Sequence, residues 1–110
     1  MTFGFNYDHW RAWLQAKATE LQKSGINTDF RHGPDEGSKP GMGLGLIGNN
    51  ALGLFENWTT GETDYTIHAT AGGEMVSHKW GLKVTDVTFE ATFNEFFAEF
   101  REYEGPGRSA

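Results

Sequence analysis

The sequence predicts an α+β domain, an antiparallel sheet of four or five strands with an N-terminal and a C-terminal helix packed on one face. Apolar residues near each end of the chain recur at helical spacing. Between these segments, apolar and polar residues alternate over short stretches, as in half-buried strands. The turns between the stretches are short, and short connections require antiparallel pairing. Such a sheet needs helices on one face only, which leaves the other face to water or to a partner.

The first helix is predicted over residues 7–24. Asn6 is a candidate N-cap, because its side chain can accept a hydrogen bond from a first-turn N–H. Gly25 can take the left-handed conformation that ends a helix, and Ile26 can pack back on the last turn. The apolar stripe of this helix comprises Trp10, Trp13, Leu14, Ala18 and Leu21.

Strands are predicted at residues 26–31, 42–48, 51–58, 63–70 and 74–80, the last with room to extend beyond Gly81. Asn49 and Asn50 fit a tight hairpin turn, because asparagine tolerates a positive φ. In the fourth strand, Tyr65, Ile67 and Ala69 share one face. The other face of that strand carries Asp64, Thr66, His68 and Thr70.

The second helix is predicted at residues 89–103. Its stripe consists of Phe89, Phe93, Phe96, Phe97 and Phe100, which we interpret as core. Thr88 is a candidate cap, and Thr92 with Glu95 offers a later capping box. We expect a single domain over residues 1–104 and a flexible tail over residues 105–110.

Composition excludes several classes of function. The 110 residues carry a net charge of −6 without a cluster of Lys and Arg, which argues against nucleic-acid binding. The absence of cysteine excludes disulfides and thiolate chemistry. No apolar stretch approaches the roughly 20 residues that span a bilayer, and the N-terminus lacks the features of a secretory signal. We therefore expect a cytoplasmic protein, with an acidic surface that serves solubility or matches a basic partner.

The pattern Gly43-x-Gly45-x-x-Gly48 matches the dinucleotide-binding motif in spacing alone. That motif requires a strand that feeds a helix, and here another strand follows. We interpret these residues as a glycine-rich strand, whose bare face lets a backbone or an aromatic ring approach closely.

No catalytic or metal-binding constellation is evident, and we expect neither cofactor nor metal. The four histidines lack metal-binding spacing, although two lie on neighbouring strands: His9, His32, His68 and His78. Glu56, Glu62 and Asp64 fit three interpretations: an acid–base pair, a solvated turn, or a contact edge beside Trp58. These interpretations remain open. They remain open also for Asp35 and Glu36, which lie in a polar loop that the glycines, prolines and charges of residues 32–41 predict.

The run from Leu54 to Ile67, the Gly73-Glu74 turn, His78 and the opening helix together resemble the TriTu-type immunity proteins. The resemblance implies an antitoxin without enzyme activity. Its partner would be an ADP-ribosyltransferase toxin domain that modifies elongation factor Tu, as carried by Rhs-type polymorphic toxins of type VI secretion. It also implies a monomer that binds the toxin in a 1:1 complex and covers its active-site cleft.

We expect the partner-binding residues to be Trp58, Glu62, Asp64, Thr66, His68, Asp35 and Glu36. Trp58 can equally belong to the core. Exchanging Glu62 and Asp64 for lysine should weaken toxin binding and leave the fold intact. The alternative function is a small ligand-binding domain or enzyme that uses the open sheet face around His68.

Overall fold

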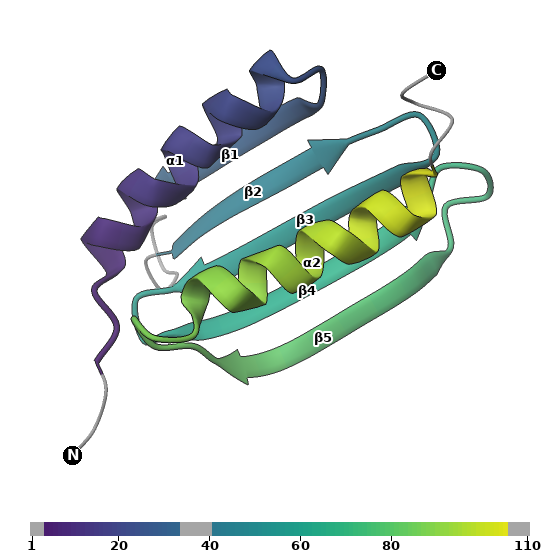
Figure 1. The fold of residues 1–110 in the computed structure, drawn as a ribbon. Coiled ribbons are helices and arrows are strands. Elements are labelled where there is room, and N and C mark those ends of the chain that lie inside the picture. The colour runs from purple at the N-terminus through teal and green to yellow at the C-terminus, as the bar shows by residue number, and fades with distance from the viewer. Residues whose placement is uncertain (1–3, 34–40, 106–110) are drawn as a thin grey trace.

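The computed structural model describes residues 4–33 and 41–105, which form two helices and five strands (Figure 1). The order along the chain is α1 (Tyr7–Lys23), β1 (Asn27–Gly33), β2 (Gly41–Ile47), β3 (Ala51–Trp58), β4 (Glu62–Ala69), β5 (Met75–Lys83) and α2 (Phe89–Glu104). The predicted α+β fold is thereby confirmed, with five strands in the sheet. Neither described helix is long and apolar enough to cross a membrane.

Helix α1 has the predicted caps. The Asn6 side chain accepts a hydrogen bond of 3.2 Å from the His9 N–H. Gly25 follows the helix with φ +104°, and the Ile26 N–H donates to the Leu21 carbonyl at 3.0 Å. This pattern is that of a Schellman motif, so the chain leaves the helix directly into β1.

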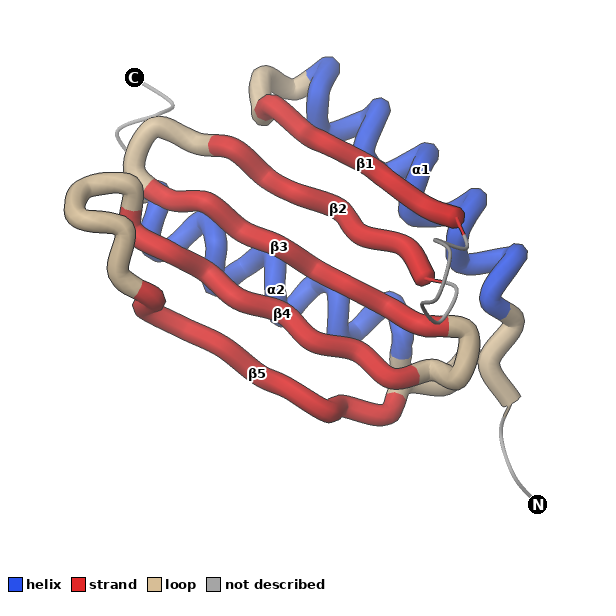
Figure 2. Tube along the Cα trace, turned by 180° about the vertical axis from the view of Figure 1, so that it is seen from behind, coloured by secondary structure: helices blue, strands red, loops and turns tan. Residues whose placement is uncertain are grey.

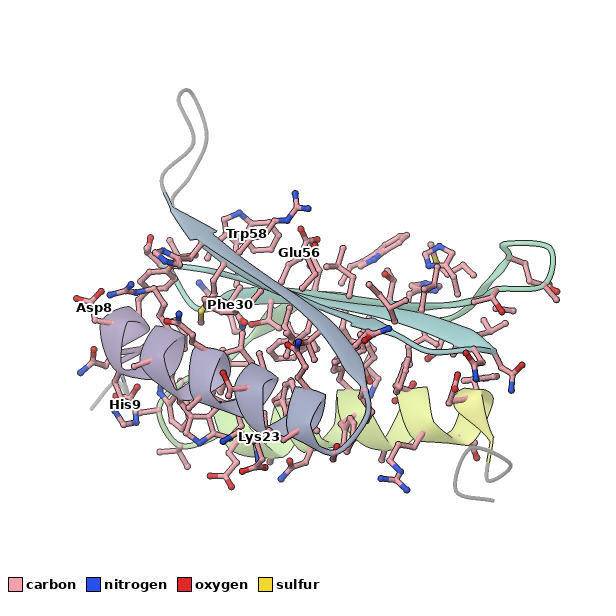
Figure 3. All side chains as sticks on the ribbon, turned by 90° about the horizontal axis from the view of Figure 1, so that it is seen from above. Asp8, His9, Lys23, Phe30, Glu56 and Trp58 are labelled. Atoms are coloured by element: carbon pink, nitrogen blue, oxygen red, sulfur yellow. The ribbon has the colours of Figure 1, made fainter. Side chains whose placement is uncertain are left out.

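The sheet is an antiparallel meander in which each strand pairs with its sequence neighbours, in the order β1-β2-β3-β4-β5 (Figure 2). Helix α1 lies along β1 and α2 lies along β3 and β4, both on the same side of the sheet (Figures 1 and 3). Within the described residues, 4–33 and 41–105, no helix lies on the other side of the sheet. We call that side the open face.

The core fills the space between sheet and helices. Aromatic rings dominate it: Phe55 on β3 packs edge-on against Phe89 and Phe93 of α2, with ring centroids 5.7 and 5.2 Å away. Trp10 of α1 stacks on Phe89 at 4.5 Å, which joins the two helices directly. The predicted phenylalanine stripe is confirmed as core: Phe89, Phe93, Phe96 and Phe100 are buried and Phe97 is half-buried.

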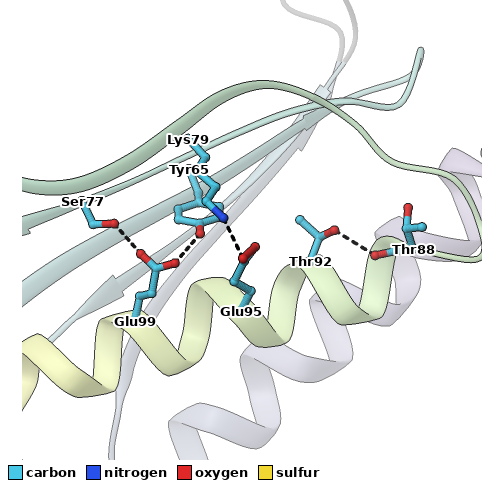
Figure 4. A network of polar contacts seen from close by, with 7 residues as sticks. All are labelled: Tyr65, Ser77, Lys79, Thr88, Thr92, Glu95 and Glu99. Carbon is cyan, nitrogen blue, oxygen red and sulfur yellow. Dashed lines mark hydrogen bonds and ion pairs between the residues drawn. The ribbon is translucent and has the colours of Figure 1, made fainter.

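A polar network fastens β4 and β5 to α2 (Figure 4). The Tyr65 hydroxyl and the Ser77 hydroxyl both donate to the Glu99 carboxylate, the former at 2.6 Å. Lys79 forms an ion pair of 2.7 Å with Glu95. Burial raises the pKa of Glu99, but the hydrogen bonds from Ser77 and Tyr65 and the charge of Lys79 outweigh it, so the pKa lies below its ordinary value. Burial and the Glu99 hydrogen bond raise the pKa of Tyr65.

Thr88 occupies the predicted N-cap position of α2, but neither predicted capping interaction forms. Thr88 precedes the helix, but its side chain makes no capping bond. Its hydroxyl accepts instead from the Thr85 N–H at 3.0 Å, within the turn before the helix. Thr92 lies inside the helix, where its hydroxyl donates to the Thr88 carbonyl, and Glu95 faces Lys79.

The β2–β3 turn lies where the sequence predicts it, but its geometry differs. No described residue other than glycine has a positive φ, so Asn49 and Asn50 do not take the left-handed conformation. Glu104 at the end of α2 holds this turn, and its carboxylate accepts from the N–H groups of Asn49, Asn50 and Ala51 at 2.9, 2.8 and 3.0 Å.

Candidate protein-binding surface

The open face derives from the alternation of side chains along β3 and β4. In β3 the residues from Ala51 to Asn57 alternate between buried and more accessible, and β4 repeats this pattern. The buried set faces the helices. The accessible set forms the open face and consists of Leu52, Leu54, Glu56 and Trp58 on β3 and Glu62, Asp64, Thr66 and His68 on β4.

Several of these side chains are apolar and exposed. Leu54, at the centre of the face, is 40% exposed, and Trp80 on β5 is 60% exposed. The Trp80 ring lies 4.4 Å from the ring of His78 on the same strand. An accessible surface with clustered aliphatic and aromatic side chains has the composition of a protein interface.

Trp58 is half-buried and points away from the helices, beside Glu56 on the open face (Figure 3). Gly41 is its cross-strand partner on β2, and a Cβ atom on Gly41 would lie only 3.2 Å from the Trp58 Cδ1 atom. The indole therefore rests on β2, where glycine makes room for it. Trp58 therefore does not belong to the core between the sheet and the helices, and the interpretation of Trp58 as a core residue is wrong.

Two carboxylates stand opposite each other at the centre of the face. Glu56 on β3 is the cross-strand partner of Asp64 on β4. Like charges in directly opposite positions destabilise a sheet. Burial, and then the charge of Asp64, raise the pKa of Glu56. Within residues 4–33 and 41–105, the Glu56 carboxylate makes no hydrogen bond or ion pair.

Other charges on this face have counterparts. The Asp29 carboxylate on β1 pairs with the Arg31 guanidinium at 3.1 Å. Glu62 on β4 has Lys83 of β5 as its cross-strand partner. The carboxylates of Glu56 and Asp64 thus remain as a concentration of negative charge between the two outer pairs.

A pocket of about 1090 Å³ surrounds one end of β2 and is lined from both sides of the sheet, with Gln15 of α1 and the helix-facing Phe30 and Met42 among its residues. The part of this pocket on the open face is a groove that runs over β2. Its floor consists of Gly41, Gly43 and Gly45, which carry no side chains. Leu54, Glu56 and Trp58 of β3 line one side, and Asp29 and Arg31 of β1 line the other. We call this groove the glycine trough. The helix-side part of the pocket reaches Asn57, whose buried Oδ1 atom has no hydrogen-bond partner among the described residues.

The structure brings five of the predicted site residues onto the open face: Trp58, Glu62, Asp64, Thr66 and His68. Asp35 and Glu36 lie outside the described residues. Asp64 also has a structural role, because its carboxylate accepts from the Gly81 N–H at 2.8 Å beside an irregularity in the β4–β5 pairing. Replacing Asp64 with lysine would therefore disturb the sheet as well as the surface, and Glu56 is the better probe.

Sequence reasoning did not single out Leu52, Leu54 or Trp80 as surface residues. Alternation places Leu54 on the face opposite Phe55, and that pattern was available in the sequence. The face on which Trp80 lies depends on the irregular β4–β5 register, and the sequence does not reveal that register. His68 and His78 do lie on neighbouring strands, but the described residues contain no group of three metal-ligating side chains.

The chain matches the model of a known protein family. The family model described as "Immunity protein TriTu" matches residues 8–99, from the first turn of α1 to the Glu99 network of α2. The chain belongs to the TriTu family of immunity proteins. No curated protein and no solved structure matches it.

Family membership confirms the resemblance that the sequence indicated. An immunity protein acts by binding a cognate toxin, so a TriTu protein needs a surface that can hold another protein. The matched range includes all five strands and therefore the whole open face.

Proposed function

We propose that this TriTu protein binds the ADP-ribosyltransferase domain of a cognate toxin through its open face and inhibits the enzyme by covering the active-site cleft. It acts by occupancy, without chemistry of its own. The toxin domain would belong to an Rhs-type polymorphic toxin of type VI secretion and would modify elongation factor Tu in the cytoplasm. The complex would contain one copy of each protein.

The observation that carries this proposal is the open face itself. The five strands contain seven to nine residues each. With about 4.8 Å between neighbouring strands and about 3.3 Å per residue, the sheet has a flat footprint of roughly 500 Å². Side-chain relief enlarges this area toward the roughly 800 Å² that each partner contributes to a standard interface. The face combines exposed apolar side chains, Leu54 and Trp80 among them, with charged ones, a mixture that can anchor a protein interface.

Charge supports the same proposal. The chain carries a net charge of −6, and the Glu56–Asp64 pair concentrates negative charge on the open face. A basic partner surface would be attracted at long range, which speeds the capture of a toxin. Rapid capture is useful to an inhibitor that must act before its target is modified.

The test is a titration of this protein into an assay of NAD-dependent ADP-ribosylation of elongation factor Tu by the toxin domain encoded beside its gene. We expect activity to fall linearly and to reach background at a 1:1 ratio. NAD binding by the toxin domain should be lost in the complex, because the cleft is covered. Full activity at tenfold excess of folded protein would contradict the proposal, whereas inhibition with NAD binding intact would contradict occlusion alone.

A further inference from the structure

The fold alone does not explain why β2 carries three glycines on the open face. Glycine weakens a strand because it loses more backbone entropy than other residues and packs no side chain. β2 nevertheless carries glycine at Gly41, Gly43 and Gly45, at every second position on the open face. Each of these glycines has either a structural reason or a functional one.

The structure separates the two cases. Gly41 has a structural reason, because a Cβ atom there would lie 2.8 Å from the Asn57 carbonyl oxygen. A Cβ atom on Gly43 would lie 3.7 Å from the Glu56 Cγ atom, and one on Gly45 would lie 3.7 Å from the Asp29 Cβ atom. Both distances are ordinary van der Waals contacts.

Backbone conformation does not require these two glycines either. The described glycines with positive φ do not include Gly43 or Gly45. Any residue with good strand propensity therefore fits at both positions, and valine would suit the strand better than glycine. What glycine provides at Gly43 and Gly45 is the empty space above them.

One charged group beside that space, the Glu56 carboxylate, lacks an oppositely charged partner among the described residues. Glu56 leans over Gly43, as its Cγ distance shows, and its carboxylate has no ion pair within residues 4–33 and 41–105. Asp64 on the neighbouring strand adds a second negative charge, while Arg31 on the far side of the trough is already paired with Asp29. A cation entering the trough would relieve the repulsion between Glu56 and Asp64.

We propose that the glycine trough receives a protruding segment of the toxin domain, whose backbone lies against Gly43 and Gly45 and whose lysine or arginine side chain binds Glu56. This inference rests on the proposed function for the identity of the partner. Bare glycines let a second backbone approach the sheet, and the Glu56 carboxylate offers that segment a charged anchor.

The experiment compares Gly43→Val and Gly45→Val with wild type, using the full chain and the toxin domain encoded beside its gene. Thermal unfolding should show a midpoint that is unchanged or raised by up to about 5 °C. Calorimetry should show a loss of affinity of about 100-fold or more, because the valine side chains fill the space that the partner occupies. Ala98→Val, on the exposed surface of α2, is the matched control and should bind like wild type.

Glu56→Gln tests the anchor separately and keeps the side-chain shape. Its affinity should fall by about tenfold or more, and its dependence on salt should be weaker than that of wild type. Glu90→Gln, an exposed carboxylate on α2, is the charge control and should leave both quantities unchanged.

The other outcomes of these experiments would contradict either the trough proposal or the proposed function. Wild-type affinity in the valine variants would overturn the proposal, as would a fall in their unfolding temperature, which would assign the glycines to the fold. Wild-type self-association that the valine variants abolish would make a second copy the occupant. A wild-type protein that fails to bind the toxin domain would refute the proposed function, whereas binding that ignores the trough variants would refute the present inference alone.

Discussion

Replacing Glu104 with alanine should lower the free energy of unfolding by about 3 kcal/mol. The Glu104 carboxylate is buried and accepts hydrogen bonds from three consecutive backbone N–H groups of the β2–β3 turn, at 2.8–3.0 Å. A hydrogen bond to a charged group contributes about 1.5 kcal/mol or more. Asn49 and Asn50 are exposed, so their N–H groups regain water in the variant and part of the loss is recovered. The Ala51 N–H is buried and remains without a partner, which costs about 1–3 kcal/mol.

The assay is urea unfolding followed by tryptophan fluorescence and circular dichroism, with thermal unfolding alongside. A loss of 3 kcal/mol corresponds to a fall of roughly 10 °C or more in Tm for a domain of this size. Glu104→Gln retains one acceptor oxygen and should lose about half as much. Glu102→Ala, an exposed residue on the same turn of α2, is the control. A Glu104→Ala variant within about 0.5 kcal/mol of the control would refute the reasoning.

Two further predictions concern the helix side of the sheet. Gly53→Ala should cost about 1–3 kcal/mol, because its Cβ atom would lie 2.9 Å from the Phe96 ring; an unchanged urea midpoint would contradict this packing argument. Tyr65→Phe removes a donor to Glu99 and should cost about 1–2 kcal/mol at neutral pH, measured by the same urea unfolding. The Glu99 pKa is depressed by its donors, so its stabilisation is present above the unfolded-state value of about 4.3 and is lost as pH falls through the folded-state value. Tyr65→Phe should therefore flatten the loss of stability between about pH 5 and pH 2, and an unchanged slope would contradict that role.

The parts of the fold that local signals specify were predictable from the sequence. Helix α1 begins after a side-chain cap at Asn6 and ends in a Schellman motif at Gly25, and both signals lie within a few residues of the helix. The antiparallel pairing from β2 to β5 follows from the short turns between these strands, because they have no room to pair otherwise. The face that each residue of β4 occupies follows from strict alternation.

The parts that long-range contacts decide were not predictable. The geometry of the Asn49-Asn50 turn depends on Glu104, more than 50 residues away along the chain. Thr88 has the residue type of a cap, but its hydroxyl binds the Thr85 N–H in a turn that the sequence does not reveal. Propensity ranks candidates for a cap, whereas the chain segment that competes for the same hydroxyl decides the outcome.

The same distinction applies to the candidate surface. Trp58 and Asp64 could be assigned to one face by alternation alone, but the pairing of Glu56 with Asp64 requires the β3–β4 register. Predicting the trough requires the pairing of three strands, because its walls come from β1 and β3 and its floor comes from β2. The glycine spacing indicated a bare strand face, and the structure adds which of these glycines the fold itself needs.

Binding of the toxin domain to the open face is the proposal on which the others depend. The most direct measurement is the elongation factor Tu titration, repeated with Leu54→Lys at the centre of the open face and with Ala98→Lys on the outer surface of α2. We expect Ala98→Lys still to abolish ADP-ribosylation at a 1:1 ratio, and Leu54→Lys, although folded, to leave it active. Inhibition by Leu54→Lys together with failure of Ala98→Lys would place the interface on the helices and refute binding through the open face.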